Sequence, residues 1–452
     1  MAKRRRIRFN SLEVAWKRSR ECDRLFHSAR DFVGHGTHTL SIAAGNFAHI
    51  FGNAYGTAKG GSPRALVASY KVCWSTSHLC SLMPFPLGPS MQLLEMYLWF
   101  PLLAMMAPTP STVTNVAPWS FTDAASTIHR DFLTNISLGN QIYLKGVSLN
   151  RGLPSRKFYP VHAVYARLHN VTIQDAKNII GTKPAPIMAG FSSRGPSVVQ
   201  PLILKPDITG PGVSILAGYS LATGPSIIQS DKRRIPFNVQ QGTSMSCSHV
   251  AGVAGLLKTL YPHWSPAATK SAIKTTAITL DNTYQPIGDA FDEIATPFEY
   301  GAGHIQPSLA IDPGLVYDLS TTDYFNFLCA SGYTEALLKL FDSLKTSYTT
   351  CPMSYNIEDF NYPSITVHHH GPNPLNVTRT ITNVGPPSTY VVSTRKDLRP
   401  TGHGLMNGGP IITRRFVIVT IFTDTKWVPI PLSFSYCHLP PQPRSPQCLL
   451  RS

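Results

Sequence analysis

Gly242-Thr243-Ser244-Met245-Ser246 places a serine where a glycine turn opens a helix. The residues that follow, 247–257, are small or apolar on every face, which predicts that this helix is buried. A serine at a helix N-terminus lies beside unpaired backbone N–H groups and the positive end of the helix dipole. Those groups can stabilise the oxyanion that forms when the serine attacks a carbonyl carbon. Ser244 is therefore a candidate nucleophile, and the alternative is that it serves only as an N-cap.

Two glycines of the same helix bear on how closely it packs. Gly252 and Gly255 are three residues apart and so lie on one face. Because neither carries a side chain, we expect the backbone of a neighbouring segment to approach this face closely.

A candidate base lies far upstream, in the stretch Asp31-Phe32-Val33-Gly34-His35-Gly36-Thr37-His38-Thr39. The glycines beside His35 allow another segment to reach the imidazole, and the small residues at 40–45 predict a tightly packed helix. His35 and His38 could instead be metal ligands, but nothing nearby completes a metal site. The long separation of His35 from Ser244 fits a large α/β hydrolase better than a local metal loop, so we expect no metal and no cofactor.

The two stretches resemble the histidine and serine motifs of the subtilisin-like serine proteases, and their residues are most similar to those of the plant subtilases. Phe191-Ser192-Ser193-Arg194-Gly195-Pro196 and residues 205–212 resemble the loop and strand ahead of the serine. Residues 300–304 and 312–318 resemble the segment behind it, and residues 360–365 resemble the start of the family's C-terminal domain. The similarity covers roughly residues 28–74, 107–177 and 178–396.

This resemblance implies an α/β fold, with a subtilisin-like parallel sheet flanked by helices and a C-terminal fibronectin type III-like β-sandwich. Residues 1–30 would form an atypical basic N-terminal segment, 31–330 the catalytic domain and 356–440 the sandwich. The family's inserted protease-associated domain is expected to be missing near 177/178. Because the ends of an insert lie close together, its removal should do little damage to the fold.

The family's triad runs Asp, His, Ser, so the resemblance implies that His35 is the general base and Ser244 the nucleophile. Attack by the serine gives an acyl-enzyme, which water then hydrolyses. The family's Asp-Thr-Gly pattern is not found in residues 1–34, where Asp23 and Asp31 are the only aspartates, so no catalytic Asp is assigned. Ser248 replaces the family's usual proline in the first helical turn, which should weaken that turn only slightly.

The family's oxyanion asparagine is also replaced. Counting back from the family-like residues 108–119, its position is held by Met105. Residues 88–107 resemble nothing in the family, yet the codons they imply, read one frame out, permit the family's Ser-Ala-Gly-Asn. We infer a segment read out of frame, and we expect residues 81–107 to be irregular.

Charge and composition limit the possible partners. The formal net charge is +16, but charged residues make up only 14% of the chain and no aromatic–basic pattern recurs, so we expect a solvated basic tail and no nucleic-acid partner. The apolar run 96–107 is too short to cross a bilayer and is broken by Pro101, so no membrane anchor is expected. The sequence does not indicate an oligomeric state.

The resemblance implies an extracellular protein of the apoplast or cell wall, although no secretory leader is visible in this chain. Asn135, Asn170 and Asn376 each begin an Asn-x-Ser/Thr triplet and are glycosylation candidates in the secretory route. The eight cysteines contain no Cys-x-x-Cys pair, which argues against a zinc or thioredoxin-like site. Two pairs could form disulfides, Cys73 with Cys80 and Cys329 with Cys351.

Local patterns place further elements. Residues 65–72 are short, β-rich and flanked by loops, which predicts a buried parallel strand. Ser265 followed by Pro266 is a typical helix start, so a second helix is expected from there. The alternating residues 378–382 and 390–392 fit an antiparallel sandwich.

Two classes of function follow. The first is a serine endopeptidase that hydrolyses peptide bonds in proteins or peptides through His35 and Ser244, with impaired activity in this chain. The second is a catalytically inactive relative that acts as a binding scaffold, or the product of a defective gene model. The transcript across residues 75–110 and upstream of Met1 would discriminate between the two.

Overall fold

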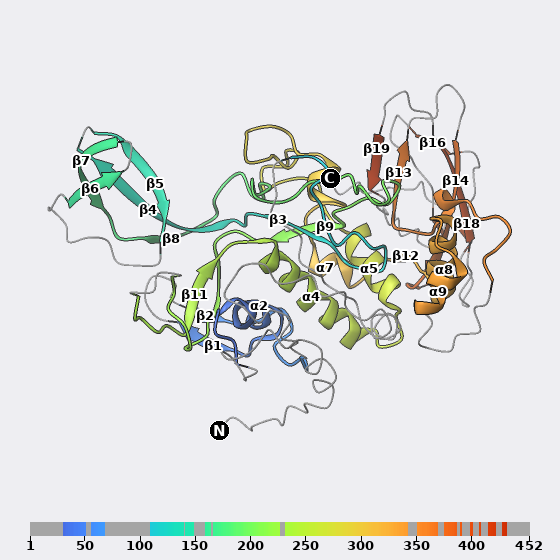
Figure 1. The fold of residues 1–452 in the computed structure, drawn as a ribbon, viewed down its shortest axis with the longest axis horizontal. Coiled ribbons are helices and arrows are strands. Elements are labelled where there is room, and N and C mark those ends of the chain that lie inside the picture. Colours follow the sequence, from blue (N-terminus) through green and yellow to red (C-terminus); the bar gives the residue numbers. More distant parts are fainter. Residues whose placement is uncertain are drawn as a thin grey trace, which may run out of the picture.

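The computed structural model describes residues 30–50, 56–67, 109–139, 141–148, 159–163, 166–226, 231–341, 350–368, 375–386, 389–390, 398–400, 406–407, 415–421 and 427–431. Helices lie at the centre of the molecule, between an antiparallel sheet that projects at one end and the strands of a sandwich at the other (Figure 1). Among the described helices, none combines the length and apolar character that crossing a membrane needs.

The centre is built on helix α4 (Thr243–Leu260), which packs against the parallel strands β3 (Asp123–Ser126) and β9 (Ile208–Pro211). Val250 and Leu257 of α4 lie in one buried cluster with Phe121 and Ile208. Helix α2 (His35–Ala44) packs against α4 as well (Figure 1). The predicted buried helix and the parallel sheet flanked by helices are confirmed.

Helix α5 (Pro266–Thr275) begins where the sequence places it. The side chain of Ser265 caps the helix by accepting a hydrogen bond from the backbone N–H of Ala268 at 2.9 Å, and Pro266 occupies the first turn. The short helices α6 (Pro297–Tyr300) and α7 (Pro307–Ala310) follow along the chain.

The close approach expected at the glycine face of α4 is present. The Cα atom of Gly252 lies so near Gly61 that a Cβ atom on Gly252 would stand 2.9 Å from the Gly61 Cα and 2.9 Å from the carbonyl oxygen of Ala43. Gly255 is less crowded, since a Cβ there would meet nothing nearer than the Ser62 Oγ at 3.4 Å. At Gly252 the backbone of α4 therefore packs directly against Ala43 of α2 and against Gly61, further along the chain.

Two antiparallel hairpins flank α2. The first comprises β1 (Ala48–Ile50) and β2 (Gly56–Ala58), and the second comprises β10 (Ile215–Gly218) and β11 (Phe237–Gln240). The strand predicted over residues 65–72 is wrong in the part that the structure describes, because residues 65–67 lie outside any strand and Leu66 is 82% exposed. With its side chain in solvent, Leu66 contributes nothing to the core that a parallel strand would need. Residues 68–72 lie outside the described ranges.

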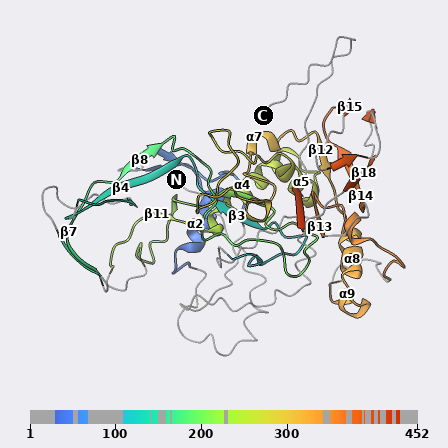
Figure 2. The same ribbon diagram turned by 90° about the horizontal axis from the view of Figure 1, so that it is seen from above.

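The projecting sheet is formed by residues on both sides of the 177/178 junction (Figure 2). It is antiparallel and runs in the order β5-β4-β7-β6, with β8 also paired to β4. Its strands are β4 (Arg130–Leu138), β5 (Tyr143–Val147), β6 (Tyr159–Ala163), β7 (Ala166–Ile173) and β8 (Lys177–Ile180). The pairs Arg130–Ile180 and Leu133–Lys177 close the base of the sheet, so the chain leaves and re-enters the central body at neighbouring points.

The C-terminal strands are all antiparallel and confirm the predicted β-sandwich class. One sheet runs β12-β14-β18-β16, and separate pairs are β13 with β19 and β15 with β17. The strands are β12 (Leu315–Tyr317), β13 (Ser364–His368), β14 (Leu375–Asn383), β15 (Thr389–Tyr390), β16 (Leu398–Pro400), β17 (Met406–Asn407), β18 (Arg415–Ile421) and β19 (Trp427–Pro431). β12 joins this sheet from within residues 31–330, the range expected for the catalytic domain.

Between β12 and β13 lie α8 (Thr321–Ala330), α9 (Glu335–Phe341) and a 3₁₀ turn (Ile357–Asp359). Cys329 at the end of α8 is bonded to Cys351, one of the two pairings that the sequence allowed. The other candidate pair, Cys73 and Cys80, lies outside the described residues. Cys247 is a buried thiol of α4.

A buried ion cluster joins the central domain to the sandwich. The carboxylate of Asp207 accepts hydrogen bonds from Lys205 Nζ at 2.7 Å, from Lys274 Nζ at 2.8 Å and from the hydroxyl of Tyr362. Lys270 Nζ lies 3.3 Å from the same carboxylate and donates to the Tyr362 hydroxyl at 2.6 Å. All five side chains are buried, and Tyr362 comes from the segment that leads into β13.

Candidate active site

Helix α4 has Gly242 as its N-cap and begins at Thr243, so Ser244 is its second residue. The backbone N–H of Gly242 donates to the carbonyl of Gly212 at 2.8 Å, which fixes the start of α4 to the end of β9. Within Thr243–Ser248, Ser244 is the residue that is only half-buried. Ser244 is thus the residue of this stretch that is most accessible to solvent.

The two other serines of the motif have structural partners. Ser246 Oγ donates to the carbonyl of Ala124 in β3 at 2.6 Å, and Ser248 Oγ donates to the carbonyl of Ser244 at 2.8 Å. Ser248 is the sixth residue of α4 and so lies in its second turn, not in the first turn as the resemblance suggested. The helix runs unbroken through Ser248, although a hydroxyl that bonds back to its own helix tends to weaken that helix slightly.

His35 is the first residue of α2 and is half-buried. Four hydrogen bonds to the carboxylate of Asp31 shape the turn in front of it. Asp31 Oδ1 accepts from the backbone N–H groups of Val33 at 3.0 Å and Gly34 at 2.8 Å. Asp31 Oδ2 accepts from both the backbone N–H and the hydroxyl of Thr37 at 2.7 Å. A carboxylate at a helix N-terminus also interacts favourably with the helix dipole.

These surroundings set the protonation states of both groups. Burial lowers the pKa of His35 below its usual value, and the negative charge of Asp31 opposes that shift in part. For Asp31, burial alone would raise the pKa of the carboxyl, but the hydrogen bonds from Thr37, Gly34 and Val33 outweigh it and lower the pKa. At neutral pH the imidazole of His35 is therefore neutral and able to accept a proton, as a general base must.

The two helices meet close to these residues, about two turns after His35 in α2 and directly after Ser244 in α4. Ile42 of α2 and Met245 of α4, the neighbour of Ser244, lie in one buried cluster with Ile215 and Ala217 of β10. His38 adds a polar link, since its Nε2 lies 3.1 Å from the carbonyl oxygens of both Ile215 and Asn238. The helices that carry His35 and Ser244 are thus held together through β10, although direct contact between the two side chains stays a prediction.

His38, the alternative metal ligand, is fully buried and faces backbone carbonyls. Burial lowers the pKa of His38 to about 4, so the imidazole is neutral there at physiological pH. Within the described ranges, no three His, Cys, Asp or Glu side chains gather where they could hold a metal ion.

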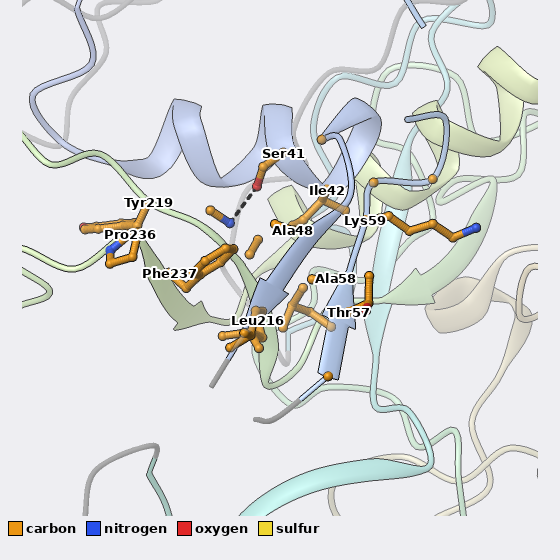
Figure 3. A pocket seen from close by; sticks show the side chains of 18 of the residues that line it. Ser41, Ile42, Ala48, Thr57, Ala58, Lys59, Leu216, Tyr219, Pro236 and Phe237 are labelled. Carbon is orange, nitrogen blue, oxygen red and sulfur yellow. Dashed lines mark hydrogen bonds between the residues drawn. The ribbon is translucent and has the colours of Figure 1, made fainter. Parts of the chain in front are cut away.

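A cavity of about 670 Å³ lies beside α2, between that helix, the β1–β2 hairpin and β10 (Figure 3). Ser41 and Ile42 of α2, Lys59 and Leu216 are among the residues that line it, and Ser41 Oγ accepts a hydrogen bond from the backbone N–H of Gly218 at 2.9 Å. Neither His35 nor Ser244 lines the cavity, which lies behind α2 rather than at the predicted catalytic pair.

The remaining predicted residues are scattered. Asn135 is exposed on β4, where its Nδ2 donates to Gln174 Oε1 at 3.2 Å, and Asn170 and Asn376 lie on β7 and β14. Met105, with the whole of 81–107, lies outside the described residues. No motif pointed to Tyr219 or Ser220, yet both hydrogen-bond to the segment in front of His35.

Comparison with known proteins agrees with this architecture. A sequence model described as the subtilase family matches residues 111–303, and one described as a fibronectin type-III domain matches residues 359–401. A subtilisin-like protease of Glycine max is 39% identical to the chain, covering 87% of the chain and 67% of that protein. Subtilisin-like proteases SBT5.3 and SBT5.4 of Arabidopsis thaliana are 38% and 37% identical, covering 81% and 82% of the chain and 64% of each protein.

The chain therefore belongs to the subtilase family, as the histidine and serine motifs indicated. It spans about two thirds of the length of these curated relatives.

Proposed function

We propose that the chain is a serine endopeptidase in which Ser244 is the nucleophile and His35 the general base. The observation that carries the proposal is the position of Ser244, half-buried at the start of α4, in a chain whose α2 packs against that helix. The relatives named as subtilisin-like proteases support the same reaction class.

The local geometry suits acyl transfer. A neutral His35 takes the hydroxyl proton of Ser244 as the oxygen attacks the scissile carbonyl, and returns that proton to the leaving amine. The oxyanion that forms lies at the start of α4, where backbone N–H groups and the helix dipole stabilise negative charge. Water, activated by the same imidazole, then releases the acyl group from the serine.

We propose further that the activity of this chain is impaired. By alignment of motifs, Met105 occupies the place of the family's oxyanion asparagine, and a thioether cannot donate a hydrogen bond. Removing one such donor typically lowers the rate by about 10²–10³. A scaffold that binds peptides without cleaving them is the second candidate, and Met105 is the observation that favours it.

Substrates would be proteins or peptides in an extracellular setting. The disulfide between Cys329 and Cys351 suits an oxidising compartment, and Asn135 is exposed in an Asn-x-Ser triplet. Asn170 and Asn376 are further glycosylation candidates.

The proposed division is an N-terminal segment at 1–30, a catalytic domain at 31–330 without the protease-associated insert, and a sandwich at 356–440. The alignment with the Glycine max protein runs over 538 residues, more than the 452 of this chain, so the relative contains segments with no counterpart here. The direct pairing of β4 with β8 supports a chain that closes across residue 177.

The test is to express residues 1–452 unchanged and measure hydrolysis of a peptide amide, alongside labelling of Ser244 by a fluorophosphonate. Weak turnover that disappears in Ser244→Ala and His35→Ala supports the proposal. Peptide binding without turnover or labelling would favour the scaffold, and turnover that survives in Ser244→Ala would refute the assignment of the nucleophile.

A further inference from the structure

Two residues that directly follow β10 form hydrogen bonds with the turn in front of His35. The hydroxyl of Tyr219 donates to the carbonyl of Val33 at 3.0 Å, and Ser220 Oγ donates to the carbonyl of Asp31 at 2.6 Å. Both side chains belong to residues that are at most 9% exposed. The backbone on either side of Phe32 is therefore fixed to the segment that directly follows β10, which is distant in sequence.

The ring of Tyr219 also lies directly against Gly34. A Cβ atom on Gly34 would stand 2.3 Å from the Tyr219 Cζ, and Gly34 has a φ of +90°, which a residue with a side chain rarely adopts. The glycine before His35 is thus required both by its own backbone angle and by the tyrosine packed on it.

Asp31 completes the arrangement without acting as a triad acid. Its two oxygens already accept four hydrogen bonds, from Val33, Gly34 and, twice, Thr37, which occupy the acceptor sites of a carboxylate. It has no lone pair to spare for the imidazole, so it acts on His35 by shaping the turn and through its charge.

We propose that Tyr219 and Ser220 are positioning residues that clamp the turn 31–34 and thereby hold His35 in a fixed, partly desolvated place at the start of α2. The inference rests on the proposed function, since it gives the general base its support. Hydrogen bonds to both carbonyls and the ring on Gly34 restrain the same short segment from one side. Small displacements of a catalytic group can lower a rate by up to about 10², which is the effect such a clamp prevents.

The test compares Tyr219→Phe and Ser220→Ala with variants that lose equivalent bonds elsewhere. Tyr261→Phe removes a hydroxyl that donates to the Ile311 carbonyl at 2.7 Å, and Ser331→Ala removes one that donates to the Phe327 carbonyl at 2.8 Å. The main readout is NMR titration of the imidazole of His35 in the full chain, assigned by its absence in His35→Gln. A second readout is the rate of fluorophosphonate labelling.

Loosening the turn admits water to the imidazole, and burial is the larger influence on this group, so its pKa should rise toward 6.5 in both clamp variants. The control variants should leave that pKa where it is in the parent chain. Labelling should fall roughly tenfold in the clamp variants and stay unchanged in the controls.

A His35 pKa that moves no further in the clamp variants than in the controls overturns the inference, whatever the labelling rates. If the parent chain does not label at all, the proposed function fails while the titration still decides the inference. Ser220→Ala leaves the Tyr219 ring and hydroxyl in place, so it remains informative if Tyr219→Phe does not fold.

Discussion

Tyr362 donates its hydroxyl hydrogen to the buried carboxylate of Asp207, and through this bond a residue leading into β13 completes an ion cluster of the central domain. Three lysines surround that one carboxylate. Burial and the repulsion between the three ammonium groups therefore disfavour the protonated form of the lysines. Burial lowers the pKa of Lys270 well below its usual range and that of Lys274 to about 8, although Asp207 opposes both shifts. The same hydroxyl therefore donates a hydrogen bond to the carboxylate of Asp207 and accepts one from the ammonium group of Lys270.

Replacing Tyr362 by Phe should lower the free energy of unfolding by about 1–3 kcal/mol, since a buried carboxylate loses a donor and a buried lysine loses an acceptor. Urea unfolding of the full chain measures the change. Tyr284→Phe is the control, because Tyr284 is 76% exposed. Equal stability of the two variants would mean that the cluster rearranges without the hydroxyl.

The two glycines of α4 should respond in opposite directions to alanine. Gly252→Ala places a Cβ atom 2.9 Å from Gly61 and Ala43, so overpacking should destabilise the protein by about 1–3 kcal/mol. Gly255→Ala has room and gains helix propensity, so it should be neutral or stabilising by up to about 1 kcal/mol. Melting temperatures of the two variants give the comparison, and a Gly252→Ala variant as stable as the parent would contradict the close approach.

Acid should weaken the fold through His38. Its folded-state pKa of about 4 lies below the unfolded value near 6.5, so the unfolded chain binds the proton more readily. The stabilisation is complete above pH 6.5 and is lost as the pH falls toward 4. Each such group contributes a slope of up to about 1.4 kcal/mol per pH unit in that window.

In His38→Gln, the free energy of unfolding should therefore fall less steeply between pH 6.5 and 4.5 than in the parent chain. Above pH 7 the two stability curves should run parallel, which serves as the internal control. Curves that stay parallel down to pH 4.5 would show that His38 does not carry the acid sensitivity.

The disulfide Cys329–Cys351 closes a loop with a sequence separation of 22. Replacing both cysteines by serine should lower the free energy of unfolding by about 3 kcal/mol, because the open loop gains entropy in the unfolded chain. Denaturant unfolding of the double variant provides the measurement. A reducing agent should destabilise the parent chain by a similar amount and leave the variant unaffected, and a parent chain indifferent to reduction would contradict the bond.

The features that could be predicted from the sequence are those encoded locally. Ser265 and Pro266 start α5 because a cap and a proline act within a single turn. The small residues of α4 predicted a buried helix for a similar reason, since composition over a few turns reports burial. The motifs around His35 and Ser244 identified the family, and thereby the sheet and the sandwich.

What could not be predicted depends on contacts between distant segments. The residues near Leu66 do not indicate that it is exposed, because a short sequence of β-favouring residues can occur both in a buried strand and in a loop. β12 lies among residues of the central domain, yet its hydrogen bonds are with β14, more than fifty residues on. The roles of Tyr219 and Tyr362 likewise arise only when separate segments fold onto one another.

The base of the projecting sheet has a practical consequence. Arg130 pairs with Ile180, and the backbone N–H of Gly181 donates to the carbonyl of His129 at 2.6 Å. The two points at which the chain leaves and re-enters the central body are therefore hydrogen-bonded neighbours. Whatever is threaded between those two points places almost no geometric demand on the helices behind it. The protein therefore offers a site for domain insertion, where a binding module or a reporter can replace the sheet while α2 and α4 keep their positions.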